Sequence, residues 1–262
     1  MATNQVERNT RLVRALDEIL DSLAFDVAHP IKVLKLAEGK EVVVVQSNAF
    51  TISRIYTSGR PDGKKPHGRE SYYEYFCEQL EDYKRQHGSD EGFGLTPEDW
   101  RVLFRESYDR YTRYLLFAGI KRWAEVKHDT NTNLAVTNMA KKYAPSEVAW
   151  ESYQYKGYML MMNSMANAEL CLMDDDRQGA LEQVDLGIQR IGKFCGECLR
   201  ENYGDAENVT RERYLSNLIE FRSDLESVEE GLDGEQESHE DEDDDVDFLE
   251  ELEELLDEEN RN

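Results

Sequence analysis

The apolar residues near the start of the chain recur at the spacing of one helix face. Between residues 5 and 24, Arg and Glu separate them, as on the polar side of a helix that is partly buried. The apolar positions are Val6, Leu12, Val13, Leu16, Ile19, Leu20 and Leu23. The pattern predicts an amphipathic helix.

A different pattern follows Pro30, which disfavours helix at the residue before it. Apolar and β-branched residues occupy 31–37, 42–45 and 50–57, and polar turn residues separate these runs at 38–40 and 47–48. Such runs are typical of strands. We therefore predict a three-stranded antiparallel β meander. Because so short a sheet is only marginally stable alone, we expect it to lie against a helix.

Most of the chain from Ser71 to residue 227 has helical periodicity. The clearest helix start is Thr96-Pro97-Glu98-Asp99, which has the order of an N-cap, a proline in the first turn and two acids near the positive end of the helix dipole. Other helices are predicted at 70–86, 126–143, 147–173, 177–200 and 208–227. Short loops between long helices make neighbours antiparallel.

A faint internal repeat links two of these helical hairpins. A shift of 54 positions superimposes Leu116 on Leu170 and Val126 on Ala180. In the second hairpin, small or slender residues stand where a tetratricopeptide repeat (TPR) has a close helix crossing: Ala168, Ala180, Val184 and Gly187. Neither hairpin has the full TPR pattern, so we describe them as TPR-like.

The predicted fold class is mainly α, a bundle of TPR-like helical hairpins with a small N-terminal antiparallel β meander and a disordered acidic tail. We expect three parts: 1–95 with the first helix, the meander and a Tyr-rich helix, 96–227 with the helical hairpins, and 228–262 as the tail. The length of 262 residues suits one medium-sized globular unit or two small ones. The composition excludes collagen, low-complexity and disulfide-scaffold classes.

The charge of the chain is concentrated in its tail. The net charge is −25, and residues 226–262 carry 20 acids and one base, so the rest is only mildly acidic. Residues 227–245 have too few apolar side chains to offset chain entropy, which predicts disorder. After them come apolar residues at helical spacing, and these are candidates for binding a partner with a basic rim: Phe248, Leu249, Leu252, Leu255 and Leu256. The alternative is a solubilising tail whose leucines have no role.

The loop at residues 58–70 is the most function-like segment before the tail. It has Pro-Asp-Gly turn chemistry and precedes a helix start, where free amides and cations favour an anion such as phosphate. The candidate anion-binding residues are Arg60, Lys64, Lys65, His67 and Arg69. The spacing fits neither the nucleotide P-loop nor the dinucleotide fingerprint. The alternative, which we favour, is that Arg60 and Arg69 bind internal acids and fix the connection.

The cysteines indicate a reducing compartment. Cys195 and Cys198 have the spacing of a redox or zinc half-site, yet they lie on a helical stripe and no second ligand pair accompanies them. They favour core thiols in a cytoplasmic protein. No run of residues reaches the length of a membrane span, and no secretory signal is visible, so we expect a soluble protein that does not engage a membrane.

Neither catalysis nor direct nucleic-acid binding has a clear motif. No nucleophile with a base, no paired carboxylates and no closely spaced histidines stand out, although an enzyme assembled from distant residues stays open. Arg105, Arg110 and Arg113 lie among aromatic residues, which would suit base stacking, but no basic stripe runs along a face. We predict no cofactor and no metal.

A last set of residues, between about 50 and 200, carries a family resemblance. The segments are Tyr56–Gly68, Ser71-Tyr72, His87–Phe93, Asp129-Thr130 with Asn133-Leu134, and Ala180-Leu181 with Gly187-Ile188. Together they resemble a family of bacterial proteins that contain a UvrB/UvrC motif. The resemblance places that motif on Met165–Ile191, with Ala168, Asp176, Ala180 and Ile188 on its pattern and Leu186-Gly187 where the motif usually has Arg-Asp. It implies a helical hairpin for protein contacts, as in excision repair and in adaptors of Clp-type unfoldases.

The sequence favours a non-enzymatic adaptor or scaffold in the cytoplasm, whose helical body binds one protein and whose acidic tail docks on a basic partner. Two alternatives stay open. One is an anion- or nucleotide-binding module or enzyme that uses the 58–70 loop, and the other is a UvrB/UvrC-motif contact protein in DNA repair or an unfoldase-adaptor system. A further possibility is that the tail imitates nucleic acid and occupies a basic cleft.

Overall fold

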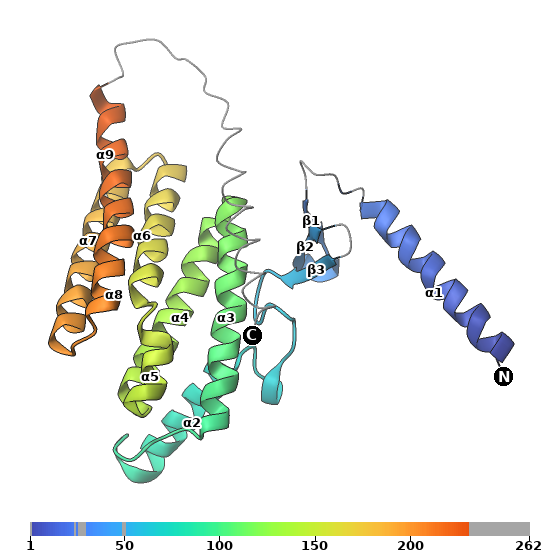
Figure 1. Ribbon diagram of the computed structural model, residues 1–262, viewed down its shortest axis with the longest axis horizontal. Coiled ribbons are helices and arrows are strands. Elements are labelled where there is room, and N and C mark those ends of the chain that lie inside the picture. Colours follow the sequence, from blue (N-terminus) through green and yellow to red (C-terminus); the bar gives the residue numbers. More distant parts are fainter. Residues whose placement is uncertain (1, 24, 26–29, 49–50, 231–262) are drawn as a thin grey trace. The chain divides into compact units, whose positions relative to one another are not determined.

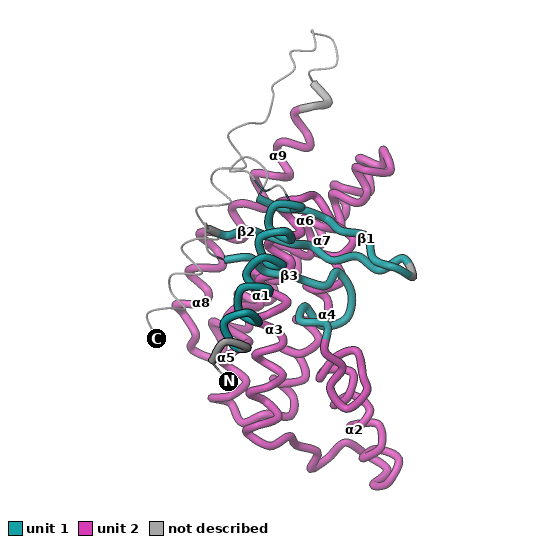
Figure 2. The backbone as a smooth tube through the Cα atoms, turned by 90° about the vertical axis from the view of Figure 1, so that its right-hand side faces the viewer, with its two compact units in different colours: residues 1–63 teal, residues 64–262 magenta. Residues whose placement is uncertain are grey.

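The computed structural model describes residues 2–23, 25, 30–48 and 51–230. The chain forms two compact units, Met1–Gly63 and Lys64–Asn262 (Figure 2). This boundary differs from the predicted one after residue 95. The reason is that Phe76, in the helix that follows the loop, is buried in one apolar cluster with Trp100 and Leu103 and therefore belongs with the helices.

The first unit contains the predicted helix and the predicted meander. Helix α1 spans Ala2–Leu23. Strands β1 (Ile31–Lys35), β2 (Glu41–Asn48) and β3 (Thr51–Tyr56) form one antiparallel sheet in the order β1-β2-β3, with a short 3₁₀ turn at Ala37–Gly39. Val43 of the central strand pairs with Val33 on one side and Ile55 on the other. All four valines of β2 are buried, as expected for the middle of a sheet.

The second unit is an array of helices (Figure 1). Its helices are α2 (Tyr72–His87), α3 (Pro97–Gly119), α4 (Trp123–Tyr143), α5 (Ser146–Tyr153), α6 (Lys156–Met173), α7 (Arg177–Arg200), α8 (Gly204–Val209) and α9 (Ser216–Glu230), with a 3₁₀ turn at Pro66–Gly68 and a π-helical turn at Thr210–Leu215. The long helices contact one another in the order α3, α4, α6, α7, α9. The structure is thus mainly helical, as predicted.

The cap predicted at Thr96 and a second cap, which the sequence analysis did not predict, hold helix starts in the structure. Thr96 and Asp99 form a capping box, in which the Asp99 amide donates to Thr96 Oγ1 at 3.2 Å and the Thr96 amide donates to Asp99 Oδ2 at 3.0 Å. At the start of α7, Asp176 Oδ1 accepts from the Gly179 amide at 2.8 Å. Both caps satisfy amides that the helix itself leaves without a partner.

The shift of 54 positions relates the two hairpins throughout. Helices α3 and α6 end at Gly119 and Met173, and the turns that follow each contain a residue with positive φ, Lys121 at 56° and Asp175 at 57°. The inner faces correspond as well, because the following pairs are buried in both hairpins: Tyr114 and Ala168, Val126 and Ala180, Thr130 and Val184, Asn133 and Gly187, Thr137 and Ile191. The α3–α4 and α6–α7 hairpins therefore share the position of their turn and five buried positions.

A close helix crossing lies at Gly187 on α7. A Cβ atom added there would stand 2.5 Å from the Cβ of Ser164 on α6 and 2.8 Å from Leu218 Cδ2 on α9. Ala168 and Ala180 are fully buried at the same interface. The small residues that the sequence placed at a close crossing are confirmed, because only a glycine leaves room for both neighbours.

Two predicted helices are divided in the structure. The prediction of a single helix over 147–173 was wrong, because the chain breaks at Gln154–Tyr155 into two helices, α5 and α6. A hydrogen bond of 2.6 Å between Ser152 Oγ and Thr137 Oγ1 ties α5 to α4 before the chain turns into α6. The helix predicted at 208–227 begins earlier, at Gly204, and a π-helical turn separates α8 from α9.

Two further expectations concern membranes and the tail. Within the described part of the chain, no helix has the length and apolar character needed to cross a membrane. The tail predicted for 228–262 lies outside the described residues from 231 onward, while α9 continues to Glu230.

The crossing at Gly187 is testable with two substitutions on one helix. Gly187→Ala should lower the free energy of unfolding by about 1–3 kcal/mol, because the added methyl group has no space. Gly192→Ala, on the same helix with no atom within 4 Å of the added Cβ, should raise it by about 0.5–1 kcal/mol through helix propensity. Urea denaturation measures both, and equal stabilisation by the two variants would contradict the close crossing.

Candidate functional site

The 58–70 loop divides between the two units, and its first part is folded onto β3. The Tyr56 amide donates to the Pro61 carbonyl at 2.9 Å. Gly63 has φ of +73°, and a Cβ atom there would lie 2.6 Å from Tyr56 Cδ2, so this position requires glycine. The Arg60 guanidinium donates to both carboxylate oxygens of Asp62, at 3.0 and 2.8 Å. Arg60 therefore fixes the turn.

The second part of the loop lies in the helical unit, where its cations also face acids. Lys65 forms an ion pair with Glu70, and Arg69 Nε donates to the Glu78 carboxylate at 2.7 Å. The hydrogen bond from Arg69 to Glu78 raises the pKa of Arg69. His67 stacks on Tyr75 with ring centroids 4.0 Å apart. Lys64 is exposed.

These contacts match the structural interpretation of the loop. Arg60 and Arg69 both bind acids of their own unit, as that interpretation expects. An anion would have to compete with Asp62, Glu70 or Glu78 for its cations. Anion binding by Arg60, Lys64, Lys65, His67 and Arg69 stays a prediction.

The candidate residues of the tail, Phe248, Leu249, Leu252, Leu255 and Leu256, lie outside the described residues.

The cysteine pair lies in the helical unit. Cys195 and Cys198 are buried on α7, and burial raises the pKa of both thiols, that of Cys198 to about 11. A reactive thiol needs a lowered pKa. The prediction of core cysteines is confirmed.

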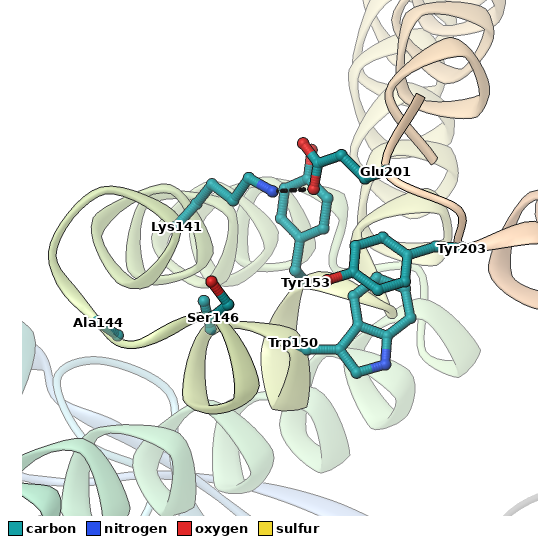
Figure 3. Close-up of a pocket in the computed structure, with 8 residues that line it drawn as sticks. Lys141, Ala144, Ser146, Trp150, Tyr153, Glu201 and Tyr203 are labelled. Carbon is teal, nitrogen blue, oxygen red and sulfur yellow. Dashed lines mark hydrogen bonds and ion pairs between the residues drawn. The ribbon is translucent and has the colours of Figure 1, made fainter. Parts of the chain in front are cut away.

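A hollow that the sequence analysis missed lies where α4, α5 and the end of α7 meet (Figure 3). Its volume is about 130 Å³, and it is lined by Lys141, Ala144, Ser146, Ala149, Trp150, Tyr153, Glu201 and Tyr203. We call it the Trp150 hollow. The Trp150 and Tyr203 rings stack with centroids 3.7 Å apart and an interplanar angle of 16°. Stacked aromatic rings thus form one wall.

The end of α7 positions that wall. After the helix, Asn202 adopts φ of +63°, a conformation that asparagine tolerates better than most residues, and the Tyr203 amide donates to the Cys198 carbonyl at 2.8 Å. This turn directs the chain back so that the Tyr203 ring meets Trp150 of α5. No local sequence pattern would reveal a hollow assembled from three separated elements.

The opposite wall of the Trp150 hollow contains one positive and one negative side chain, which pair with each other. Lys141 forms an ion pair with Glu201, and its ammonium lies 4.4 Å from the centroid of the Tyr153 ring. Such a position over a ring is attractive. The Lys141 ammonium in the hollow therefore already interacts with both the Glu201 carboxylate and the Tyr153 ring.

Two further charged residues, Glu197 and Lys156, fix the position of the Tyr153 side chain. Its hydroxyl donates to Glu197, and Lys156 donates to the same carboxylate at 3.2 Å. Burial and this carboxylate raise the pKa of Tyr153. Burial alone would raise the pKa of Glu197, but the hydrogen bonds and charge from Tyr153 and Lys156 lower it below its ordinary value. Tyr153 is thus fixed as a neutral donor.

A cluster of four charged residues is buried between α3 and α4. Arg113 Nε and Nη2 donate to the two oxygens of Asp129 at 2.7 and 2.6 Å, in the two-point geometry that favours arginine. Arg110 donates to Asp129 Oδ1 at 3.4 Å and to Glu106 Oε1 at 3.3 Å. None of the four side chains is more than 3% exposed. The cluster carries equal numbers of positive and negative charges.

The same cluster reaches the start of α2. The Tyr72 amide, in the first turn of that helix, donates to Glu106 Oε2 at 2.8 Å. Arg110 and Arg113, which the sequence analysis considered for base stacking, are thus enclosed among helices, where nucleic acid has no access. These contacts indicate a structural role for the cluster, because they join α2, α3 and α4.

Comparison with protein-family models, with curated proteins and with solved structures yields no match. The described residues also contain no group of His, Cys, Asp and Glu side chains that could hold a metal ion.

The buried cluster predicts a large difference between two Asp→Asn substitutions. Asp129→Asn leaves Arg113 and Arg110 with one buried acid between them, and unfolding should become easier by about 3–5 kcal/mol. Asp82→Asn removes one partner of the exposed pair with Arg85 and should cost less than about 1 kcal/mol. Thermal and urea unfolding test this, and similar losses for both variants would refute a structural role of the cluster.

Proposed function

We propose that the protein is a non-enzymatic interaction adaptor. In this proposal the helical hairpins bind one protein through the Trp150 hollow, and the acidic tail, residues 228–262, binds a second protein with a basic surface. The observation that carries the proposal is the hollow itself, because it combines stacked aromatic rings with a lysine that is paired with a carboxylate.

The size of the hollow favours one side chain as its occupant. An enclosed cavity of about 150 Å³ accommodates benzene, so an open hollow of about 130 Å³ offers space for about one side chain. Trp and Tyr are the residues that most often dominate binding at protein interfaces. The rings of Trp150 and Tyr203 would contact the inserted side chain, while Lys141 and Glu201 at the rim would contact the partner's polar groups.

The hollow is also held in place before any partner arrives. Trp150 is stacked on Tyr203, the Tyr153 hydroxyl donates to Glu197, and the ammonium groups of Lys141 and Lys156 lie 4.4 and 4.9 Å from the centroid of the Tyr153 ring. Side chains fixed in this way lose little conformational freedom on binding, which favours affinity. This rigidity supports a recognition site over an accidental surface depression.

The charge distribution supports a second contact through the tail. Residues 226–262 contain 20 acids and one base, and a leucine stripe that begins near Phe248 lies among them. Such a segment can fold against an apolar groove with a basic rim. We further propose a cytoplasmic location, since all four cysteines are free thiols.

The resemblance to proteins with a UvrB/UvrC motif offers a second candidate setting. It places the motif on 165–191, a segment that spans the end of α6, its turn and the first part of α7. A hairpin of two antiparallel helices is the form that the resemblance implies, so DNA repair and unfoldase adaptors are two systems in which to search for the partner.

Capture from cell extract with matched variants tests the adaptor proposal. The full chain is compared with Trp150→Ala, with a truncation after Glu230, and with Tyr155→Ala as the control, since Tyr155 is exposed and outside the hollow. Trp150→Ala should reduce one partner about tenfold or more, and the truncation should remove a different one. Tyr155→Ala should retain both.

The capture experiment contradicts the proposal if neither variant changes the recovered proteins. It also contradicts the two-contact arrangement if both variants lose the same partner. Circular dichroism of each variant checks that the helices persist, and Trp150→Phe, which keeps a ring in the wall, should retain binding of the first partner.

Ligand-dependent thermal shift separates the adaptor from an anion-binding module. A ligand at 100 times its Kd adds about 2.7 kcal/mol to stability. Because acids already contact Lys65 and Arg69, we expect inorganic phosphate, nucleotides and sugar phosphates to leave the melting temperature unchanged. A stabilisation that Arg69→Ala abolishes would instead favour the anion-binding alternative.

A further inference from the structure

The lining of the Trp150 hollow indicates the chemistry of the side chain that it accepts. One wall is the stacked pair of Trp150 and Tyr203, with ring centroids 3.7 Å apart. The other wall carries Lys141 and Glu201, whose side chains are both 38% exposed and therefore within reach of a partner (Figure 3). An incoming side chain thus meets flat rings on one side and a charged pair on the other.

A cation already lies at a favourable position in the hollow. The Lys141 ammonium pairs with Glu201 and lies 4.4 Å from the centroid of the Tyr153 ring. A carboxylate beside aromatic rings attracts cations, because the negative charge and the negative faces of the rings act in the same direction. The hollow therefore stabilises positive charge, and within this chain Lys141 is the group that takes that position.

The charges beside the hollow also favour a positive partner. Ser146 and Trp150 line the hollow, and each is followed on α5 by an exposed glutamate, Glu147 and Glu151. Helix α5 contains no basic residue. Acids beside a binding site attract cations and repel other acids. The same charges disfavour the tail of this chain as the occupant, since residues 226–262 contain 20 acids and one base.

An arginine side chain suits this environment better than a lysine side chain. The guanidinium is planar and weakly hydrated, so it stacks on aromatic faces, and it offers two parallel donors to one carboxylate. The lysine ammonium is a compact and strongly hydrated charge. Arginine is also enriched among the residues that dominate binding at protein interfaces. The hollow, at about 130 Å³, has space for about one such side chain.

We infer that the Trp150 hollow binds an arginine side chain of the partner protein. The guanidinium stacks against the wall of Trp150 and Tyr203 and displaces Lys141 from Glu201. The hydroxyl groups of Ser146 and Tyr203, which also line the hollow, accept from its remaining N–H groups. This inference rests on the proposed adaptor function, because it specifies the chemistry by which the hollow recognises its partner.

Titration of the full chain with short peptides tests the inference, with the NMR signal of the Trp150 indole N–H as the readout. Trp150→Phe identifies that signal by its loss. The peptide N-acetyl-Gly-Gly-Arg-Gly-Gly-amide should shift the signal. The same peptide with citrulline, which has the shape of arginine without the charge, should bind about tenfold more weakly. A peptide with glutamate at that place should not bind.

Two substitutions in the hollow should change the affinity for the arginine peptide in opposite directions. Glu201→Gln removes the carboxylate and should weaken binding about tenfold. Lys141→Gln removes the competing cation and should strengthen binding about threefold. Glu220→Gln changes an exposed acid of α9 outside the hollow and should leave the affinity unchanged. The melting temperature of each variant checks that it is folded.

The absence of a shift at about 10 mM arginine peptide would overturn the inference, as would equal binding of the citrulline peptide. Binding of the glutamate peptide that Lys141→Gln abolishes would show that the hollow recognises an acid instead. Each of these results leaves the adaptor proposal standing if Trp150→Ala loses its partner in the capture experiment. If Trp150→Ala loses no partner there, the adaptor proposal itself fails.

Discussion

The helical unit depends on how closely its helices can cross at the centre of each hairpin. In the α6–α7 hairpin the crossing is made by Gly187 against Ser164, where no side chain fits. At the corresponding place in the α3–α4 hairpin stand Asn133 and Arg110, which are large and polar, yet both are buried. Corresponding positions are thus filled by small residues in one hairpin and by large polar residues in the other.

The polar hairpin compensates for its larger side chains with paired charges. Arg110 and Arg113 meet Asp129 and Glu106, so the enclosed charges are neutralised, and Asn133 donates to the Ser107 carbonyl at 2.9 Å. The two hairpins are also bonded to each other, since Asn163 of α6 donates to Thr130 Oγ1 of α4 at 2.9 Å. Hydrogen bonds of this kind require specific positions, and they favour a single relative placement of the helices.

Local chemistry explains which elements the sequence could predict. The Thr96 cap and the small residues at Ala168, Ala180 and Gly187 act within one helix or one crossing, and the structure contains each of them. The break at Gln154–Tyr155 contains neither proline nor glycine, and just before it Ser152 contacts Thr137 on another helix. Periodicity within one segment cannot reveal such a contact.

The candidate sites likewise differ in whether the sequence could predict them, because some join residues that are close in the sequence and others join distant ones. The loop cations could be assigned to nearby acids, since Arg60 and Asp62 are two residues apart and Arg69 and Glu78 nine. The Trp150 hollow joins residues from 141 to 203, and the buried pair of Arg113 with Asp129 joins two helices, so both needed the three-dimensional structure. One available signal was the position of Arg110 and Arg113 among the aromatic residues Tyr108, Tyr111 and Tyr114 of one helix.

The proposed function depends on rigidity of the helical unit, because the Trp150 hollow keeps its shape only if the hairpins behave as one body. Native-state amide hydrogen exchange tests this most directly. Amides on α4 near Asn133 and on α7 near Gly187 should exchange only through global unfolding, with free energies that agree within about 1 kcal/mol. Exchange of the α3–α4 hairpin at a much lower free energy, while α6–α7 stays protected, would show that the hairpins unfold separately and would contradict the account.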